Sequence, residues 1–248
     1  MRIDLAHAWL MICVLAGTSA SSMNVDAQPA LSARYEFRDN HDPNGIGKFY
    51  LGREIAQVMG PGGIVWLERP QREAEERSDL IVGALDIKSG QTIADLGAGS
   101  GYFTFRIASL AGPDGKVLAI DIEEAMLKVI RQRAHREGVD NIQTVRSTPK
   151  DPNLAARSID LLFMVDVYHE LEFPFEMMTS VRAALKPGGR IALIEYRRED
   201  PAVMIKEVHK MSERQIVREI TAAGFRHVKT VRTLPLQHLV FFEAKSEQ

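Results

Sequence analysis

The feature that most constrains the fold is a glycine-rich stretch that follows a short apolar run at residues 92–96. Its three glycines, Gly97, Gly99 and Gly101, alternate with other residues and lead into a pattern typical of a helix. A strand, a tight turn and a helix in this order form the first βα unit of open α/β sheets that bind nucleotide-like ligands. Glycine lets the backbone approach a ligand closely, and the start of the helix supplies free N–H donors. The stretch therefore predicts a binding loop.

The spacing of these glycines separates two classes of ligand. The dinucleotide fingerprint has glycines at relative positions one, three and six. Here the third glycine, Gly101, holds position five, and Tyr102 holds position six. The spacing argues against NAD and therefore against an NAD-linked oxidoreductase. A tight glycine turn without any ligand is the structural alternative.

An acidic residue before the glycines points to a family. With Asp95 two residues before Gly97, the loop resembles the acidic Gly-x-Gly-x-Gly loop of class I methyltransferases that use S-adenosylmethionine. The resemblance implies an α/β, Rossmann-like fold with a seven-stranded, mostly parallel sheet and a C-terminal antiparallel hairpin. It also implies cofactor contacts from this loop at Asp95, Gly97, Ala98, Gly99, Gly101 and Tyr102.

A second carboxylate stands at the end of the next expected strand, residues 116–120. Asp121 follows Gly101 by 20 residues, the place where a carboxylate accepts hydrogen bonds from both ribose hydroxyls. Its neighbour Ile122 belongs to the same expected cofactor contact. The alternative role for Asp121 is to cap the helix that begins near Glu123, and the two roles are compatible.

The following turn is the expected place of the adenine ring. After a strand at residues 142–145, the chain enters a turn with two prolines at residues 146–152. Related enzymes hold adenine near this turn with an acidic or small polar side chain, so the resemblance implies Thr148 or Asp151. A rigid proline loop without ligand contact is the alternative.

The acceptor side is expected after the apolar strand at residues 159–165, because open α/β sheets bind ligands beyond the carboxyl ends of their strands. Asp166 is expected on the cofactor side or at the entrance. A nitrogen or oxygen acceptor must lose a proton, so His169 and Glu170 are the catalytic candidates. Alternatively, His169 and Glu170 begin the next helix, where Glu170 is favourable at the positive end. For His209, a place in the acceptor pocket and a place on the surface both stay open.

Other features exclude or support classes of function. The 31 basic and 33 acidic residues leave a net charge of -2, and the Asn/Asp-Pro-Pro-aromatic signature of base methylation is missing, so no nucleic-acid partner is expected. The histidines at 41, 135, 227 and 238 lack metal-ligand spacing, and no metal site is expected. The Leu-Lys-Pro-Gly-Gly turn at residues 185–189 also resembles the family, as does the expected hairpin at residues 227–233 and 238–244. The resemblance covers residues 80–248, the expected methyltransferase domain.

The N-terminal 27 residues have the order of a secretory signal peptide. Arg2 precedes an apolar run at residues 5–16, and small residues follow. The run is shorter than the roughly 17 residues that a membrane span needs. We therefore expect cleavage after Ala27, a mature chain without a transmembrane helix, and a periplasmic or secreted location. The sole cysteine, Cys13, lies in this segment. A buried or interfacial N-terminal helix is the alternative.

Residues 28–79 are expected to form an N-terminal helical extension. Residues 28–47 predict an irregular leader, residues 51–59 a helix that ends at a Gly-Pro-Gly-Gly breaker, and the charged run after it a second helix that continues to residue 85. This segment resembles one found in secreted bacterial methyltransferases of unassigned substrate. It forms either a lid over the cofactor or a helical pair that covers the sheet edge with Trp66 as a packing anchor; the lid would carry Tyr50, Arg53, Trp66, Glu68 and Arg69.

Together these features predict an S-adenosylmethionine-dependent methyltransferase that acts on nitrogen or oxygen of a small-molecule or lipid-like acceptor. The alternative is a non-catalytic protein that keeps the fold and the cofactor to sense it or to scaffold a partner. Neither the acceptor nor the oligomeric state follows from the sequence.

Overall fold

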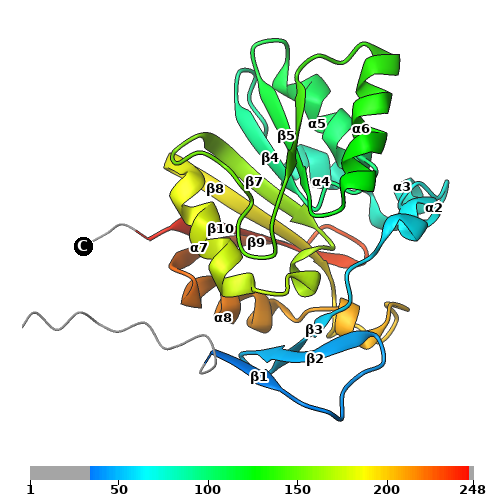
Figure 1. The fold of residues 1–248 in the computed structure, drawn as a ribbon, viewed down its shortest axis with the longest axis vertical. Helices are drawn as coiled ribbons and strands as arrows, with labels where there is room; N and C mark the ends of the chain where they lie inside the picture. The colour runs from blue at the N-terminus through cyan, green and yellow to red at the C-terminus, as the bar shows by residue number, and fades with distance from the viewer. Residues whose placement is uncertain (1–33, 246–248) are drawn as a thin grey trace, which may run out of the picture.

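The computed structural model describes residues 34–245, and a seven-stranded sheet forms its centre (Figure 1). The strand order is β6-β5-β4-β7-β8-β10-β9. Neighbouring strands from β6 to β8 are parallel, and β10 runs antiparallel to both β8 and β9. The predicted fold class is therefore confirmed. The strands are β4 (Thr92–Leu96), β5 (Lys116–Asp121), β6 (Ile142–Arg146), β7 (Ile159–Val165), β8 (Leu185–Tyr196), β9 (Phe225–Val231) and β10 (Gln237–Ala244).

The strand order reverses at the centre of the sheet. The chain runs outward from β4 through β5 to β6, then returns to β7 on the other side of β4. Connections on the two sides of such a switch point diverge, which leaves a crevice at the carboxyl ends of the central strands. This crevice is where the glycine loop after β4 lies.

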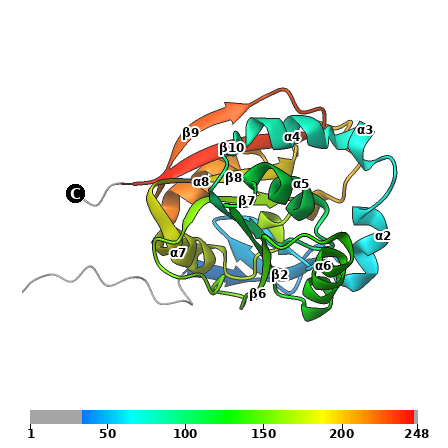
Figure 2. The same cartoon turned by 90° about the horizontal axis from the view of Figure 1, so that it is seen from above.

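Helices cover both faces of the sheet. Packing places α4 (Ser78–Ala84), α5 (Tyr102–Ala111) and α6 (Glu124–Glu137) on one face, and α7 (Pro174–Ala184) and α8 (Glu213–Ala222) on the other. In Figure 1, α5 and α6 lie to the upper right of the sheet and α7 and α8 to its lower left. Figure 2 gives the same molecule from above. Because the parallel strands are buried on both faces, they are continuous apolar runs, as the sequence predicted.

The N-terminal extension begins with a second, smaller sheet. An antiparallel sheet joins β1 (Tyr35–Phe37), β2 (Gly45–Tyr50) and β3 (Arg53–Ala56). The predicted helix at residues 51–59 is wrong, and the predicted irregular leader, residues 28–47, contains β1 and the first half of β2. The reason is the turn between β2 and β3, where Leu51 and Gly52 have φ of 47° and 82°. Positive φ at both central positions is typical of a tight hairpin turn and is incompatible with a helix.

A buried ion pair attaches this small sheet to the body of the protein. The Arg53 guanidinium donates to both carboxylate oxygens of Glu219 on α8, at 2.7 and 2.9 Å. A third hydrogen bond runs from Arg53 to the carbonyl oxygen of His169 at 3.1 Å. Both side chains are buried, so leaving either one unpaired would be strongly destabilising. The small sheet is thereby fixed beside the loop that follows β7.

Short helices connect the small sheet to the main one, so the helical part of the extension is present. They are η1 (Pro61–Gly63), α2 (Ile64–Leu67) and α3 (Arg72–Glu76), and α4 follows. The predicted single helix to residue 85 is interrupted at Arg77, whose φ of 55° ends α3 and starts α4.

Two later boundaries refine the predictions. The strand β8 begins directly after α7, so it includes the Leu-Lys-Pro-Gly-Gly segment that was expected to be a turn. Ser212 caps α8, since its Oγ accepts from the Gln215 backbone N–H at 3.1 Å. The Gln215 side chain completes no capping box and instead donates to the Leu51 carbonyl and to Glu219.

Within residues 34–245, none of the helices combines the length and apolarity that a bilayer crossing requires. The predicted signal peptide, residues 1–27, and Cys13 lie outside the described residues.

Candidate functional site

A cavity of about 410 Å³ lies at the predicted crevice, within the range of small-molecule sites. The glycine loop, the ends of β5 and β7, the short helix α2 and the segment before His209 all contribute to its wall. Residues that are far apart in the chain therefore surround one space.

The glycine loop forms the floor of this cavity. Gly97 and Gly99 line it with φ of 76° and 55°. A Cβ at Gly97 would lie 2.4 Å from Val167 Cγ2, and one at Gly99 would lie 2.9 Å from Leu67 Cδ1. At Gly97 both conformation and space disfavour a side chain, whereas at Gly99 the positive φ is the main obstacle, because the Leu67 side chain can move. Glycine at both positions keeps the backbone accessible to a ligand.

Asp121 at the end of β5 lines the cavity. One of its oxygens accepts from the Gly99 N–H at 2.8 Å, and the other accepts from the Glu123 N–H at 2.9 Å. The predicted capping role is wrong, because α6 has Glu123 as its N-cap and no side-chain hydrogen bond caps it. Burial raises the pKa of Asp121 above its ordinary value. Each oxygen keeps a further lone pair, so the position fits a ligand hydroxyl as well as the two backbone N–H groups.

Asp95 lies below the loop and is not part of the cavity wall. It accepts from the Thr104 hydroxyl at 2.6 Å and so fixes the start of α5. Burial raises the pKa of Asp95 to about 7; Thr104 and the more distant Arg72 oppose the rise, and Asp121 adds to it. The structure thus gives Asp95 a supporting position behind the ligand-facing backbone.

The other predicted cofactor residues divide into two groups. On the cavity wall are Gly97, Gly99, Asp121, Ile122, Thr148 and Asp166, whereas Asp95, Ala98, Gly101 and Tyr102 are not part of it. Of the two candidates for adenine, Thr148 lines the cavity and Asp151 does not. The Thr148 hydroxyl accepts from the Asp151 N–H at 3.0 Å, so Asp151 holds the turn in place.

Asp166 has an unusual environment at the end of β7. Its φ is 55°, a left-handed conformation that costs energy outside glycine. One carboxylate oxygen accepts from Gln237 at 2.8 Å, and the other is buried without a hydrogen-bond partner among the described residues. Burial, with Glu76 and Glu195 nearby, raises the pKa of Asp166 well above its ordinary value. Asp166 lines the cavity, and a buried acceptor without a partner there is suited to a donor on a ligand.

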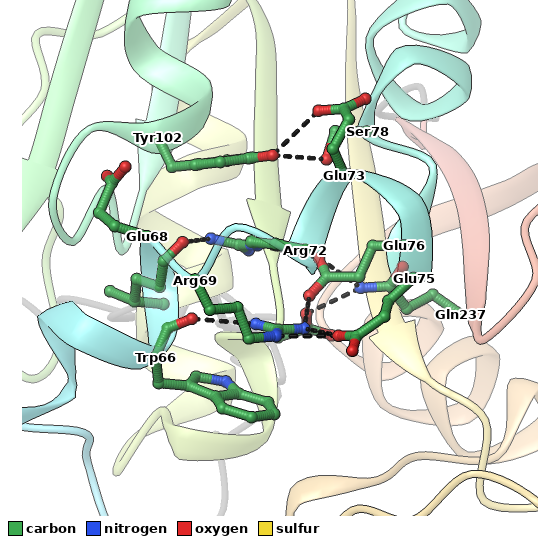
Figure 3. Close-up of polar contacts among 12 residues, drawn as sticks. Trp66, Glu68, Arg69, Arg72, Glu73, Glu75, Glu76, Ser78, Tyr102 and Gln237 are labelled. Atoms are coloured by element: carbon green, nitrogen blue, oxygen red, sulfur yellow. Dashed lines mark hydrogen bonds and ion pairs between the residues drawn. The ribbon is translucent and has the colours of Figure 1, made fainter.

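Arg72 and Glu76 of α3 complete this side of the cavity, and the sequence analysis missed both. Arg72 donates to Glu76 at 3.1 Å and to the Leu67 carbonyl at 2.9 Å. Arg69 donates to the other oxygen of Glu76 at 2.7 Å, and Figure 3 shows the Arg69 guanidinium directed toward Glu75 and Glu76. From the sequence alone, these three charged residues are most simply interpreted as side chains on the solvent-exposed face of a helix.

Trp66 and Glu68 show how α2 is placed over the cavity. Trp66 lines the cavity and is 44% exposed, so it is not a buried packing anchor. The Arg69 guanidinium lies 3.8 Å from the centre of its ring. Glu68 accepts from the Ser100 hydroxyl at 2.5 Å, which ties α2 to the glycine loop. These contacts favour the lid interpretation.

Tyr102, in contrast, directs its hydroxyl away from the cavity toward Ser78 and Glu73 (Figure 3).

The predicted catalytic residues lie on the opposite wall. His169 and Glu170 belong to η2 (Tyr168–Glu170), and His209 of η3 (Glu207–His209) meets them. His169 Nδ1 donates to Glu195 Oε2 at 2.6 Å, and its Nε2 lies 3.1 Å from His209 Nδ1. The alternative that His169 and Glu170 begin the next helix is wrong, because both lie in the separate 3-10 helix η2 and α7 begins only at Pro174. Both residues line the cavity, and their catalytic role stays a prediction.

Burial perturbs each of these three groups. It raises the pKa of Glu170 to about 7 and lowers the pKa of His209 to about 4, with the neighbouring His169 adding to the second effect. For His169, burial opposes the charge, but pairing with Glu195 raises its pKa above the ordinary value. Clusters of perturbed groups in a cavity are typical of functional sites.

Comparisons with known proteins agree on one family. Residues 87–233 match the model of a methyltransferase domain. The chain is 30% identical over 121 residues to the ubiquinone/menaquinone biosynthesis C-methyltransferase UbiE of Pseudomonas entomophila, and 28% identical over 121 residues to that of Ectopseudomonas mendocina. Each match covers 48% of this chain and 47% of the relative, so the chain spans about half the length of these relatives.

Solved structures share the fold. A SAM dependent methyltransferase from Aquifex aeolicus has a TM-score of 0.70 and 24% identity, covering 75% of this chain and 98% of its own. A methyltransferase from Mesorhizobium loti has a TM-score of 0.54 and 18% identity, covering 66% of this chain and 95% of its own.

Proposed function

The chain belongs to the methyltransferase domain family and uses S-adenosylmethionine, and we propose that it methylates a small molecule held against His169, Glu170 and His209. One observation carries this proposal. The glycine loop with Asp121 and the polar side chains after β7 face the same cavity, so a cofactor and an acceptor would meet inside it. Methyl transfer needs just such an arrangement, because the reacting atoms must be aligned with water excluded.

The residues on the cavity wall fit the cofactor. Asp121 would hold the ribose hydroxyls, and Ile122 with Thr148 would contact the adenine. The orphaned oxygen of Asp166 would accept from the α-ammonium group, and Arg72 would meet the carboxylate. When bound, S-adenosylmethionine supplies a methyl group on a sulfonium that leaves readily.

The charge of the cavity supports the same cofactor. Glu76, Asp121, Asp166 and Glu170 all line it, with Arg72 as the buried cation among them. A ligand that carries sulfonium and ammonium charges would stabilise the ionised forms of Asp121, Asp166 and Glu170, whose pKa burial raises, whereas the pyrophosphate of a dinucleotide would not. This agrees with the glycine spacing, which also argues against NAD.

The acceptor is proposed to carry an ionisable hydroxyl or amine and an apolar body. His169 and Glu170 lie where they can take a proton from nitrogen or oxygen. The cavity mouth includes exposed apolar side chains, Val58, Met59, Trp66 and Met204, which suit a lipid-like molecule.

A carbon acceptor is the second candidate, favoured by the names of the relatives. UbiE proteins are C-methyltransferases of ubiquinone and menaquinone biosynthesis. Methylation of a ring carbon beside a hydroxyl also becomes easier when that hydroxyl loses its proton, so the same polar wall would serve. The likeness covers about half of each chain, and the acceptor atom must therefore come from experiment.

A product assay tests the proposal. Purified protein is incubated with methyl-labelled S-adenosylmethionine and a panel of phenols, quinols and amines with apolar tails, and products are identified by mass spectrometry. We expect label in one acceptor class together with S-adenosylhomocysteine. Tight S-adenosylhomocysteine binding without label in any class would instead support the non-catalytic alternative.

A substitution tests whether Glu170 takes part in the reaction. Glu170→Gln should lower kcat by about 10²–10⁴-fold while cofactor affinity is retained. Glu207→Gln is the matched control, because that glutamate lies in η3 beside the wall but is 52% exposed and pairs with Arg198. Equal turnover in Glu170→Gln and the wild-type protein would remove Glu170 from the reaction.

A further inference from the structure

Three side chains on the polar wall bring one atom each to a common point. His169 Nε2 and His209 Nδ1 are 3.1 Å apart, and Glu170 Oε1 lies 3.8 Å from the first and 3.7 Å from the second. A circle through atoms with these separations has a radius of about 2.1 Å, which equals the usual zinc–nitrogen and zinc–oxygen bond length. A single ion close to its centre would lie within bonding distance of all three atoms.

Hydrogen bonding accounts for only part of this arrangement. One shared proton explains the contact between His169 and His209. Glu170 Oε1, however, is too far from either imidazole nitrogen for a hydrogen bond, although it is directed at both. A cation between the three groups explains all three separations together.

The neighbouring residues orient these atoms as they do in known metal sites. His169 Nδ1 donates to the fully buried Glu195, so the neutral ring that a metal ligand requires has its lone pair on Nε2, toward the cluster. Metal-bound histidines almost always have such a carboxylate or carbonyl partner on the second nitrogen. The other oxygen of Glu170 accepts from the Met59 N–H at 3.2 Å, which leaves Oε1 free.

We propose that His169, Glu170 and His209 bind one divalent first-row transition-metal ion, with zinc as the best fit. Two imidazoles and one carboxylate suit zinc and related ions, whereas magnesium and calcium prefer oxygen ligands. The two carboxylates of Glu170 and Glu195 balance the charge of the ion. Lys206 also lines the cavity, but its side chain is exposed and its charge is solvated.

The fourth position of the ion would face the cavity, because all three ligands line it. Protein sites with three ligands keep this position for water or substrate. The role of the ion toward the acceptor rests on the proposed function: an acceptor hydroxyl that coordinates there would have a lowered pKa and be oriented toward the methyl group, and with the ion bound this replaces direct proton removal by His169 and Glu170. The binding of the ion itself does not depend on that function.

No metal site was expected from the sequence, because the spacing of the histidines along the chain was the only criterion. His209 follows Glu170 by 39 positions, and the two histidines lie on different short helices, η2 and η3. Only the packing of η2 against η3 brings the three residues together.

Zinc binding to tag-free protein is the direct test. Metal-free protein is titrated with zinc in competition with a chromogenic chelator, and the bound metal is counted by mass spectrometry. We expect one zinc ion per chain. Cobalt substitution should add the visible absorption bands of a nitrogen and oxygen site with low coordination number.

Variants locate the ion. His209→Ala should weaken zinc binding by at least about 100-fold, and Glu195→Gln, which leaves the ligands in place, should weaken it by about 10–100-fold. His238→Ala is the matched control: His238 also pairs with a carboxylate, Glu199 at 2.9 Å, but lies outside the cavity wall. It should leave the affinity unchanged. The Glu195 variant keeps the test valid if the histidine variant does not fold.

Two results would overturn the proposal. Folded protein that binds no zinc would show that the histidines form a hydrogen-bonded pair only, and zinc lost equally in His238→Ala would place the ion elsewhere. Calorimetry with S-adenosylhomocysteine on the same samples separates the two proposals. Cofactor binding without zinc contradicts the metal site alone, and zinc binding without cofactor contradicts the proposed function alone.

Discussion

Replacing Asp121 by asparagine tests the cofactor assignment with the smallest change of shape. The aspartate uses one oxygen for the Gly99 N–H at 2.8 Å and the other for the Glu123 N–H at 2.9 Å, and it faces the cavity. Asparagine keeps one acceptor oxygen and replaces the other by a donor, without the negative charge.

The expected loss follows from hydrogen-bond energies. A hydrogen bond to a charged group contributes about 1.5–3 kcal/mol, which corresponds to about 10–150-fold in Kd. Asp121→Asn should therefore weaken S-adenosylhomocysteine binding by about 10–150-fold. Asp121→Ala removes both acceptors and should weaken it further, by about 10²–10⁴-fold.

The assay is isothermal titration calorimetry with S-adenosylhomocysteine, with thermal melting of each variant to verify folding. Asp160→Asn is the control. Asp160 also accepts from a backbone N–H, that of Thr92 at 2.8 Å, but it lies near the start of β7, at the opposite edge of the sheet. It should lower stability without changing Kd. Unchanged affinity in folded Asp121→Ala would refute the ribose assignment.

Three further predictions follow from other parts of the chain. Gly97→Ala should abolish cofactor binding, because its Cβ would lie 2.4 Å from Val167, and adding Val167→Ala should restore only part of it since φ stays positive; calorimetry measures both. Burial raises the pKa of Asp95 to about 7, against an unfolded value near 4, so the native state holds a proton between these pH values that the unfolded state releases. Stability should fall as pH rises from about 4 to about 7, and thermal melts should find this slope reduced in Asp95→Asn; an equal slope would contradict the assignment. Finally, N-terminal sequencing of protein from fractionated cells should begin after Ala27 and in the exported fraction, whereas a chain that keeps residues 5–16 would refute cleavage.

The sequence predicted the main sheet because its signals are local. Buried parallel strands are apolar runs of five to seven residues, and β4, β5 and β7 appear as such at nearly their observed bounds. The glycine loop is also local, since each glycine is needed for its own backbone conformation or its own close contact.

The small N-terminal sheet could not be predicted in the same way. Its strands have three to six residues, and most of its register depends on the turn at Leu51 and Gly52. Gly52, the second residue of the expected helix, was the available signal, because glycine lowers the helix propensity. Packing against α7 and α8, including the Arg53–Glu219 pair, then decides the outcome.

The residues that face the proposed acceptor, His169, Glu170 and His209, show where prediction of functional residues from the sequence ends. His169 and Glu170 were predicted from their place after a central strand, which is a topological rule. The meeting of His209 with them depends on how the segment after β8 folds back, and the contribution of Arg72 and Glu76 depends on how α3 crosses the cavity. Contacts of this kind are set by tertiary packing and leave no periodic pattern in the chain.

Calorimetric titration of the folded protein with S-adenosylhomocysteine, and in parallel with NAD, tests the central claim most directly. We expect saturable binding of one S-adenosylhomocysteine per chain and no heat of binding with NAD. Saturable NAD binding, or no signal with S-adenosylhomocysteine in a protein that melts cooperatively, would contradict it.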